Sequence, residues 1–244
     1  MIELGVIGAS GRTGSHVLRV LGDFAEFSLA AAVVSPESKL IGQCAGACDY
    51  SSELSEAVAR SSALIDFSLP AVTAQLIAEL KKRPKPILIA TTGHSEEQLS
   101  NIRTLSQRTA VVLASNTSRG IFALNELTKL AVKLLGDDCE VEIVESHHRA
   151  KRDAPSGTAK TLAQSVADIT KGDIRFAREA ARNSKEIGIS SIRGGDIIGD
   201  HTVYLLCNGE RIELTHRASD RSLFARGALS LLKELVTLPA GLYT

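Results

Sequence analysis

The sequence has no excess of charge of either sign and no long apolar run. Its 28 lysines and arginines balance 28 aspartates and glutamates, so no global field attracts nucleic acid or an anionic membrane surface. No apolar stretch approaches the roughly 18 residues of a membrane span, and the N-terminus has neither the basic start nor the cleavage site of a signal peptide. These absences predict a cytoplasmic protein that binds neither nucleic acid nor membrane.

Paired cysteine motifs are absent as well. The four cysteines, Cys44, Cys48, Cys139 and Cys207, form no CxxC pair, and in a chain of this size they are typical of buried or incidental thiols. A metal site through Cys44 and Cys48 is the less favoured alternative, so we expect no metal. The sequence also lacks repeats and Pro/Gly-rich linkers, which predicts that its parts are joined tightly.

Strand-like apolar runs alternate with helix-like runs over the first half of the chain. The strand-like runs cover residues 2–7, 28–34, 63–67, 86–90 and 110–114. This alternation predicts parallel strands with crossover helices in a doubly wound, Rossmann-like α/β sheet.

The rhythm changes in the second half. A helix-like run at 121–135 leads to a strand, a helix to about residue 170, and then three strand-like segments near Ile189, Val203 and Ile212. Strands that follow one another without helices predict a second, smaller α+β domain with a mixed or antiparallel sheet. The last run, 222–235, is again helix-like.

A glycine-rich turn, GASGRTG, lies between the first strand and the first helix. Glycines at 8, 11 and 14 let the backbone turn sharply and approach a pyrophosphate. The alternative is a tight turn with no ligand, but the position at the start of a doubly wound pattern favours a dinucleotide. The predicted cofactor-binding residues of this turn are Gly8, Ala9, Ser10, Gly11, Arg12 and Thr13.

The acidic residue that usually ends the second strand and binds the adenosine ribose is missing. The strand ends in Val33, Val34 and Ser35, and no arginine stands there to bind a 2′-phosphate. Ser35, Lys39 and Arg12 remain candidates for this contact. The choice between NADH and NADPH therefore stays open.

Two later strand ends carry polar tips, ATTG from residue 90 and NTSRG from residue 116. Because ligands of open α/β sheets bind at the carboxyl ends of strands, we expect these tips to line the nicotinamide half of the site; ordinary turn chemistry is the alternative. The predicted residues are Ala90, Thr91, Thr92, Ala114, Ser115, Asn116 and Thr117.

The segment from residue 140 to 163, EVEIVESHHRAKRDAPSGTAKTLA, concentrates the groups suited to chemistry. Apolar and polar residues alternate up to His147 and His148, which predicts a strand that ends at the histidine pair. A turn with Lys151 follows, and Ser156-Gly157-Thr158 opens an Ala-rich helix whose free amides suit an anion. Taken alone, each feature has a structural explanation, because histidine pairs are common on surfaces and a serine before a helix is often only its N-cap. Together they predict proton donors facing an anion site.

At these residues the chain resembles the dihydrodipicolinate reductases, bacterial and plant enzymes of lysine and diaminopimelate synthesis. The resemblance spans nearly the whole chain. It rests on GASGRTG, ATTG, NTSRG, ESHHRAKRDAPSGTA and the closing GDHTVYLLCNGERIELTHRASDRSLFARGAL, of which the fourth is the most specific.

The resemblance implies reduction of the cyclic imine dicarboxylate formed from 4-hydroxy-tetrahydrodipicolinate to tetrahydrodipicolinate, with NADH or NADPH. His147 would be the proton donor and Lys151 would protonate or polarise the ring. His148 would bind substrate, and Ser156, Gly157 and Thr158 would hold a carboxylate. The domains would be residues 1–117 with 221–244 for the dinucleotide, and 118–220 for substrate and oligomerisation. The resemblance also implies a homotetramer.

Departures from the family pattern lie in the cofactor half. They are Thr13 for methionine, Ala90 for glycine, His94 and Thr117 for aromatic residues, and Val34 and Ser35 for the acidic ribose ligand and its neighbouring arginine. They affect nucleotide preference more than activity. Two other hypotheses are a related NAD(P)-dependent dehydrogenase for another small imine or amino acid, and a sensing protein without catalysis. The retained paired histidines with Lys151 and Ser156-Gly157-Thr158 argue against the first, and the retained His147 and Lys151 argue against the second.

Overall fold

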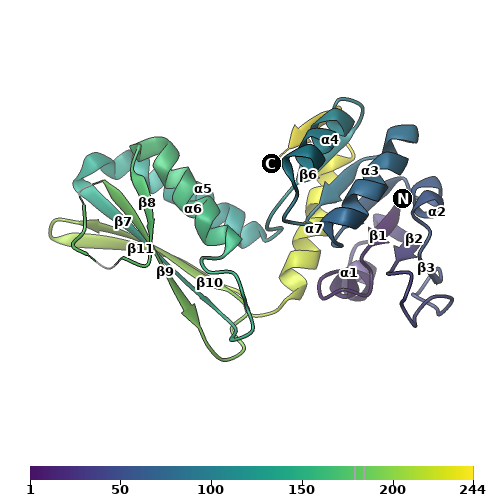
Figure 1. The fold of residues 1–244 in the computed structure, drawn as a ribbon, viewed down its shortest axis with the longest axis horizontal. Coiled ribbons are helices and arrows are strands. Elements are labelled where there is room, and N and C mark those ends of the chain that lie inside the picture. Colours follow the sequence, from purple (N-terminus) through teal and green to yellow (C-terminus); the bar gives the residue numbers. More distant parts are fainter. Residues whose placement is uncertain (179, 184, 244) are drawn as a thin grey trace. The chain divides into compact units, whose positions relative to one another are not determined.

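The computed structural model describes residues 1–178, 180–183 and 185–243. The chain forms two compact units, shown in Figure 1: Met1–Ser118 with Arg221–Thr244, and Arg119–Asp220. The first break therefore falls after Ser118, one residue later than the boundary expected from the sequence.

The first unit contains a seven-stranded sheet in the order β12-β6-β5-β4-β1-β2-β3. Every pair in it is parallel, as the alternating pattern predicted. The strands are β1 (Ile2–Ile7), β2 (Phe27–Val33), β3 (Tyr50–Ser51), β4 (Ala63–Asp66), β5 (Ile87–Ile89), β6 (Ala110–Leu113) and β12 (Gly241–Tyr243). The sequence did not reveal β3 and β12, because two or three residues are too few to show a period.

Helices cover both faces of this sheet. They are α1 (Gly14–Val20), α2 (Leu54–Arg60), α3 (Pro70–Lys82), α4 (Glu96–Ser106) and α7 (Ser222–Leu235), with a 3₁₀ turn at Leu21–Asp23. Val17 of α1 and Leu229 of α7 share one apolar cluster with β1, whereas α2, α3 and α4 pack in a second cluster on the other face. This confirms the doubly wound arrangement.

Local signals explain where two of these helices begin. Pro70 occupies the first position of α3, where its missing N–H costs nothing. Ser95 caps α4 by accepting a hydrogen bond from the Gln98 amide, and the Gln98 side chain accepts from the Ser95 amide. This capping box satisfies two amides at the helix start.

The second unit is a five-stranded mixed sheet with two helices. Its elements are α5 (Arg119–Leu135), a 3₁₀ turn (Gly136–Asp138), β7 (Cys139–His147), α6 (Gly157–Thr170), β8 (Asp173–Phe176), β9 (Glu186–Arg193), β10 (Asp200–Cys207) and β11 (Glu210–Arg217). The order is β11-β10-β7-β9-β8, with β10 antiparallel to both neighbours and the other pairs parallel. Inward side chains such as Ile143, Leu162 and Val203 form its core.

One prediction about the cysteines was wrong. Cys139 and Cys207 stand directly opposite each other on β7 and β10 and are paired in a disulfide, with their Cα atoms 4.2 Å apart. They are 68 residues apart in the chain, so their spacing in the sequence does not predict the disulfide. Cys44 and Cys48 are free thiols, the first exposed and the second half-buried.

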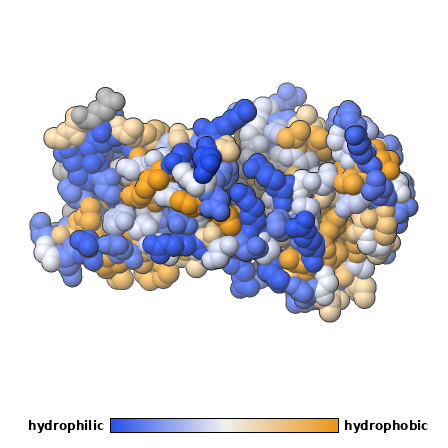
Figure 2. Space-filling model, turned by 90° about the horizontal axis from the view of Figure 1, so that it is seen from below, coloured by the Kyte–Doolittle hydropathy of each residue, from blue (hydrophilic) through white to orange (hydrophobic). Residues whose placement is uncertain are grey.

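The surface combines hydrophilic and apolar regions. Figure 2 shows apolar residues in patches among hydrophilic ones on the visible face. Exposed large apolar side chains of the second unit are Phe122, Leu127, Leu130 and Leu134 on α5 and Phe176, Ile192 and Ile212 on the strands. Among the described residues, no helix combines the length and apolar character that crossing a bilayer requires.

Candidate active site

The strand β7 delivers two ionisable side chains to the covered face of its sheet. Burial alternates along the strand, so that Val141, Ile143, Glu145 and His147 all point inward, as the period-two pattern predicted. Glu145 is 0% exposed and His147 is 8% exposed. A carboxylate with no access to water requires hydrogen-bond donors on every side.

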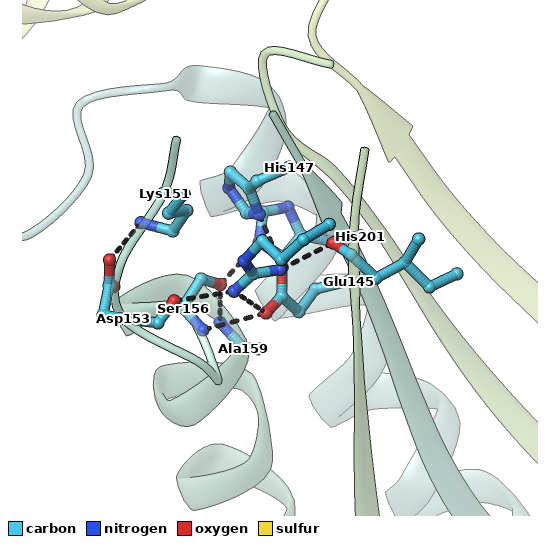
Figure 3. Close-up of polar contacts among 9 residues, drawn as sticks. Glu145, His147, Lys151, Asp153, Ser156, Ala159 and His201 are labelled. Atoms are coloured by element: carbon cyan, nitrogen blue, oxygen red, sulfur yellow. Dashed lines mark hydrogen bonds and ion pairs between the residues drawn. The ribbon is translucent and has the colours of Figure 1, made fainter. Parts of the chain in front are cut away.

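Glu145 obtains these donors from three segments of the chain (Figure 3). Its Oε2 lies 2.5 Å from His147 Nδ1 and accepts from Arg193 Nη1 at 2.8 Å. Its Oε1 accepts from Arg193 Nη2 at 2.7 Å and from the Ser156 amide at 3.1 Å. The carboxylate therefore joins β7, the end of β9 and the start of α6.

The sheet register explains how these distant residues meet. Arg193 pairs with His147 across β7 and β9, and His201 pairs with Glu145 across β7 and β10. Paired residues on neighbouring strands lie on the same face of a sheet. Three neighbouring strands thus place an acid, an arginine and two histidines on one buried surface.

The charges in this cluster are fixed by their surroundings. Burial acts to raise the pKa of Glu145, but the hydrogen bonds from Arg193, Ser191 and His147 outweigh it and lower that pKa to about 2. Burial lowers the pKa of His147, against the opposing effect of Glu145. At neutral pH Glu145 is therefore ionised and His147 is neutral. Since a carboxylate only accepts, His147 carries its proton on Nδ1.

Ser156 and His201 complete the buried cluster. The Ser156 hydroxyl caps α6 by accepting from the Ala159 amide at 3.2 Å, and it lies 3.0 Å from His201 Nε2. The His201 ring contacts the His147 ring edge-on, with 5.2 Å between centroids. Burial foremost lowers the pKa of His201 to about 3, so this ring is neutral as well.

Lys151 lies on the turn between β7 and α6 (Figure 3). Its Nζ is 2.9 Å from Asp153 Oδ1, and its amide donates to the His148 carbonyl at 3.0 Å. Arg193 also donates to the Asp153 carbonyl, at 2.7 Å. The arginine that clamps Glu145 therefore also anchors the turn that carries the lysine.

The structure brings several predicted site residues of this unit together. His147, Ser156 and the Lys151 turn lie around one cluster, and Gly157 and Thr158 form the first turn of α6 beside it. Sequence reasoning assigned no role in the site to Glu145, Arg193 or His201. An acidic residue at an inward strand position was a usable signal for Glu145. No local pattern pointed to the other two.

The glycine turn of the first unit has its own structural requirements. Gly8 has a φ of +77°, and a Cβ there would lie 2.5 Å from the Phe67 carbonyl oxygen. A Cβ on Gly14 would lie 2.1 Å from the Gly8 carbonyl oxygen. The Gly8 and Ala9 amides both donate to the Val33 carbonyl, at 3.0 and 2.8 Å. The turn is thereby fixed against the end of β2.

A carboxylate stands near this strand end although the usual acidic position holds Val34, which is buried. The Ser35 hydroxyl donates to the Glu37 carboxylate, and the Glu37 amide lies 3.4 Å from Ser35 Oγ. Sequence reasoning named Ser35 but not Glu37. The glycine turn and this Ser35–Glu37 pair both lie at the end of β2, because the Val33 carbonyl accepts hydrogen bonds from the Gly8 and Ala9 amides of the turn.

The remaining predicted cofactor residues follow β5 and β6, neighbours in the parallel sheet. The side chains of two of them form hydrogen bonds with the backbone of the protein. Thr91 Oγ1 accepts from the Ser68 amide at 3.1 Å, and Thr117 Oγ1 donates to the Phe224 carbonyl at 2.7 Å. Ala90, Thr92, Ala114, Ser115 and Asn116 occupy the same edge. No group of three or more potential metal ligands occurs in the described parts of the chain.

Comparisons with known proteins point to one family. Two family profiles match, "Dihydrodipicolinate reductase, N-terminus" over residues 2–117 and "Dihydrodipicolinate reductase, C-terminus" over residues 120–244. The 4-hydroxy-tetrahydrodipicolinate reductase of Syntrophotalea carbinolica is 40% identical over 100% of this chain and 97% of its own length. That of Akkermansia muciniphila is 40% identical over 100% and 96%.

A solved structure has the same fold. The dipicolinate-bound dihydrodipicolinate reductase from Paenisporosarcina sp. TG-14 matches with a TM-score of 0.82 and 21% identity, over 99% of this chain and 97% of that one. The profiles and the full-length relatives together establish the family and its activity. The chain belongs to the dihydrodipicolinate reductase family and is an NAD(P)H-dependent oxidoreductase with 4-hydroxy-tetrahydrodipicolinate reductase activity in lysine and diaminopimelate biosynthesis.

Proposed function

We propose that the protein reduces the conjugated cyclic imine formed by dehydration of 4-hydroxy-tetrahydrodipicolinate, and that the second unit binds this dicarboxylate. The observation that carries the proposal is the Glu145–His147 pair beside the start of α6, with Lys151 on the adjoining turn. The Paenisporosarcina relative binds dipicolinate, a dicarboxylate with the same ring skeleton. The first unit binds the nucleotide.

His147, Lys151 and Glu145 have separate roles in the proton transfer. When bound, the nicotinamide supplies the hydride. Negative charge that develops on the ring must then be stabilised and quenched by a proton. Nε2 of His147, the ring nitrogen that Glu145 does not contact, first takes up a proton from solvent and then donates it to the substrate, while the Lys151 ammonium polarises the substrate ring. Ionised Glu145 stabilises His147 whenever the ring is protonated.

The start of α6 is suited to a substrate carboxylate. The helix has 14 residues and an N-cap at Ser156, so its first amides and its dipole favour an anion. The Ser156 amide donates to Glu145, and we propose that the next two residues, Gly157 and Thr158, contact the substrate carboxylate. The Ser156 hydroxyl holds the cap, and His148 contacts the substrate from the turn.

The glycine turn and the β2 end are suited to the nucleotide. Gly8 to Thr13 form a turn whose backbone would hold the pyrophosphate, and Ser35 with Glu37 would bind the adenosine ribose. A carboxylate accepts hydrogen bonds from ribose hydroxyls and repels a 2′-phosphate. Glu37 therefore replaces the missing acid and favours NADH over NADPH, whereas Lys39 is the residue that would favour NADPH.

We also propose that the protein is a cytoplasmic homotetramer. Phe176, Ile192 and Ile212 are large apolar side chains exposed on strands of the second unit, and exposed apolar side chains are used at association sites. Sedimentation equilibrium tests the tetramer: a monomer at micromolar concentration would refute it.

The activity is tested with substrate made in situ by the preceding synthase from pyruvate and aspartate semialdehyde. Loss of nicotinamide absorbance is followed in parallel with NADH and NADPH. Rapid oxidation is the expected result. No oxidation by a folded protein that still binds nucleotide would contradict the proposal and favour a dehydrogenase for a different small imine.

A further inference from the structure

We propose that Glu145 and Arg193 are positioning residues that fix the ring tautomer of His147. They also hold the start of α6 and the turn that carries Lys151 in place beside the His147 ring. The proposal rests on the proposed role of His147 as proton donor. Neither residue needs to touch the substrate, and each acts through the groups that it holds.

The Glu145 carboxylate is saturated by donors. Oε2 faces His147 Nδ1 and Arg193 Nη1, and Oε1 faces Arg193 Nη2 and the Ser156 amide. Both oxygens thus receive one bond from the arginine and one from a group of the site. The bidentate geometry fixes the plane of the carboxylate, and the plane in turn fixes the direction of the His147 bond.

This arrangement determines where the His147 proton resides. An ionised carboxylate has no proton to donate, so Nδ1 must donate and Nε2 keeps a lone pair when the ring is neutral. Nε2 faces Gly199, where a Cβ would lie only 3.0 Å from it. The glycine leaves room at the nitrogen that takes up and releases the proton.

Arg193 extends the same restraint to the lysine. Besides Glu145, its Nη2 donates to the Asp153 carbonyl at 2.7 Å, and the Asp153 carboxylate pairs with Lys151. One guanidinium therefore sets the positions of the carboxylate behind His147 and of the turn that carries Lys151. The Ser156 amide bond places the helix start on the same carboxylate.

Glutamine in place of Glu145 disturbs this arrangement in a defined way. Its amide group carries two donors, so one oxygen position becomes a donor that opposes Arg193 whichever way the amide is turned. With the nitrogen toward His147, the ring must accept at Nδ1 and carry its proton on Nε2. The charge that stabilises the imidazolium is lost in either orientation.

The first test measures the tautomer in the wild-type protein. Nitrogen-15 NMR of protein labelled at its six histidines separates a protonated Nδ1 from a protonated Nε2, and a His147→Gln variant identifies the His147 signals. The expected result at neutral pH is a neutral ring with Nδ1 protonated. A neutral ring with Nε2 protonated would overturn the proposal without any variant of Glu145 having to fold.

The second test compares Glu145→Gln with Glu142→Gln. Glu142 lies on the same strand but on the other face of the sheet, where it pairs with Arg178 and Arg182, so it is a matched control. Glu145→Gln should lower kcat by about 10- to 100-fold, the usual cost of losing a group that orients a catalytic histidine, with a smaller change in KM. Glu142→Gln should leave the tautomer unchanged.

The pH profile separates positioning from a general loss of structure. The charged and titratable groups that face His147 are Glu145, Lys151, Arg193 and His201. Among them only Glu145 favours the protonated ring. In Glu145→Gln, the limb of the kcat–pH profile that reports the protonation of His147 should therefore move to lower pH. Glu145→Asp, which keeps the charge, should restore the limb toward the wild-type position. An unmoved limb in Glu145→Gln would overturn the proposal.

These outcomes are distinct from failure of the proposed function. Absence of reductase turnover in the wild type would refute the function while the tautomer measurement still stood. Normal turnover with the opposite tautomer would refute the positioning role alone.

Discussion

Lys151 Nζ lies 2.9 Å from Asp153 Oδ1, and the aspartate side chain is 55% exposed. The lysine proposed to polarise the ring is therefore held by a partner that water reaches. Such partly exposed pairs contribute about 1 kcal/mol or less to stability. The pair orients the ammonium more than it stabilises the fold.

Asp153→Asn should therefore have a small effect on folding and a moderate effect on turnover. We expect the free energy of unfolding to change by less than about 1 kcal/mol and kcat to fall by roughly 3- to 10-fold, because Lys151 loses its orientation but keeps its charge. Urea unfolding and steady-state kinetics measure the two quantities. A loss beyond about 100-fold would show that Asp153 itself takes part in the chemistry.

The buried His201 should make the protein sensitive to acid. Its pKa is lowered to about 3 in the folded state, with burial as the main cause, whereas the unfolded chain binds a proton near the ordinary value of about 6.5. Between these values the unfolded state binds more protons, so stability falls as the pH falls from about 6.5 to about 3.

His201→Gln tests this dependence, because an amide can still bond Ser156. The variant should lose less free energy of unfolding than the wild type between about pH 7 and about pH 4.5. Denaturant melts at the two pH values give the comparison. Equal losses in the two proteins would assign the acid sensitivity to other groups.

Glu37 should set the nucleotide preference. Glu37→Lys replaces a carboxylate that repels a 2′-phosphate by a cation that attracts it, so the ratio of kcat/KM for NADPH over NADH should rise by at least about 10-fold. Glu56→Lys makes the same change of charge at an exposed position on α2 and serves as the control. A similar rise in both variants would indicate a general charge effect instead.

The sequence predicted the elements whose residues show a period or a capping signal. The apolar runs at residues 2–7 and 222–235 predicted β1 and α7, and Pro70 and Ser95 are local signals at the starts of α3 and α4. Strands of two or three residues, such as β12, have too few side chains for a pattern. The disulfide and the strand order depend on register between distant segments, which no local pattern encodes.

The candidate site divides in the same way. His147, Lys151 and Ser156 are close in the chain, so one motif revealed them together. Arg193 is 48 residues from Glu145, and His201 is 45 residues from Ser156. Arg193 and His201 join the cluster only because β9 and β10 flank β7. Predicting them would have required knowledge of the strand order in the sheet.

The account depends most on the proton chemistry of His147 and Lys151, so the most direct measurement is turnover of in situ substrate by His147→Ala and Lys151→Ala. Lys133→Ala, at an exposed position on α5, is the control, and nucleotide binding with circular dichroism verifies that each variant is folded. We predict a loss of at least about 100-fold in kcat for each site variant, a size typical of removing general acid catalysis, and none for the control. Near wild-type turnover in either site variant would contradict the account.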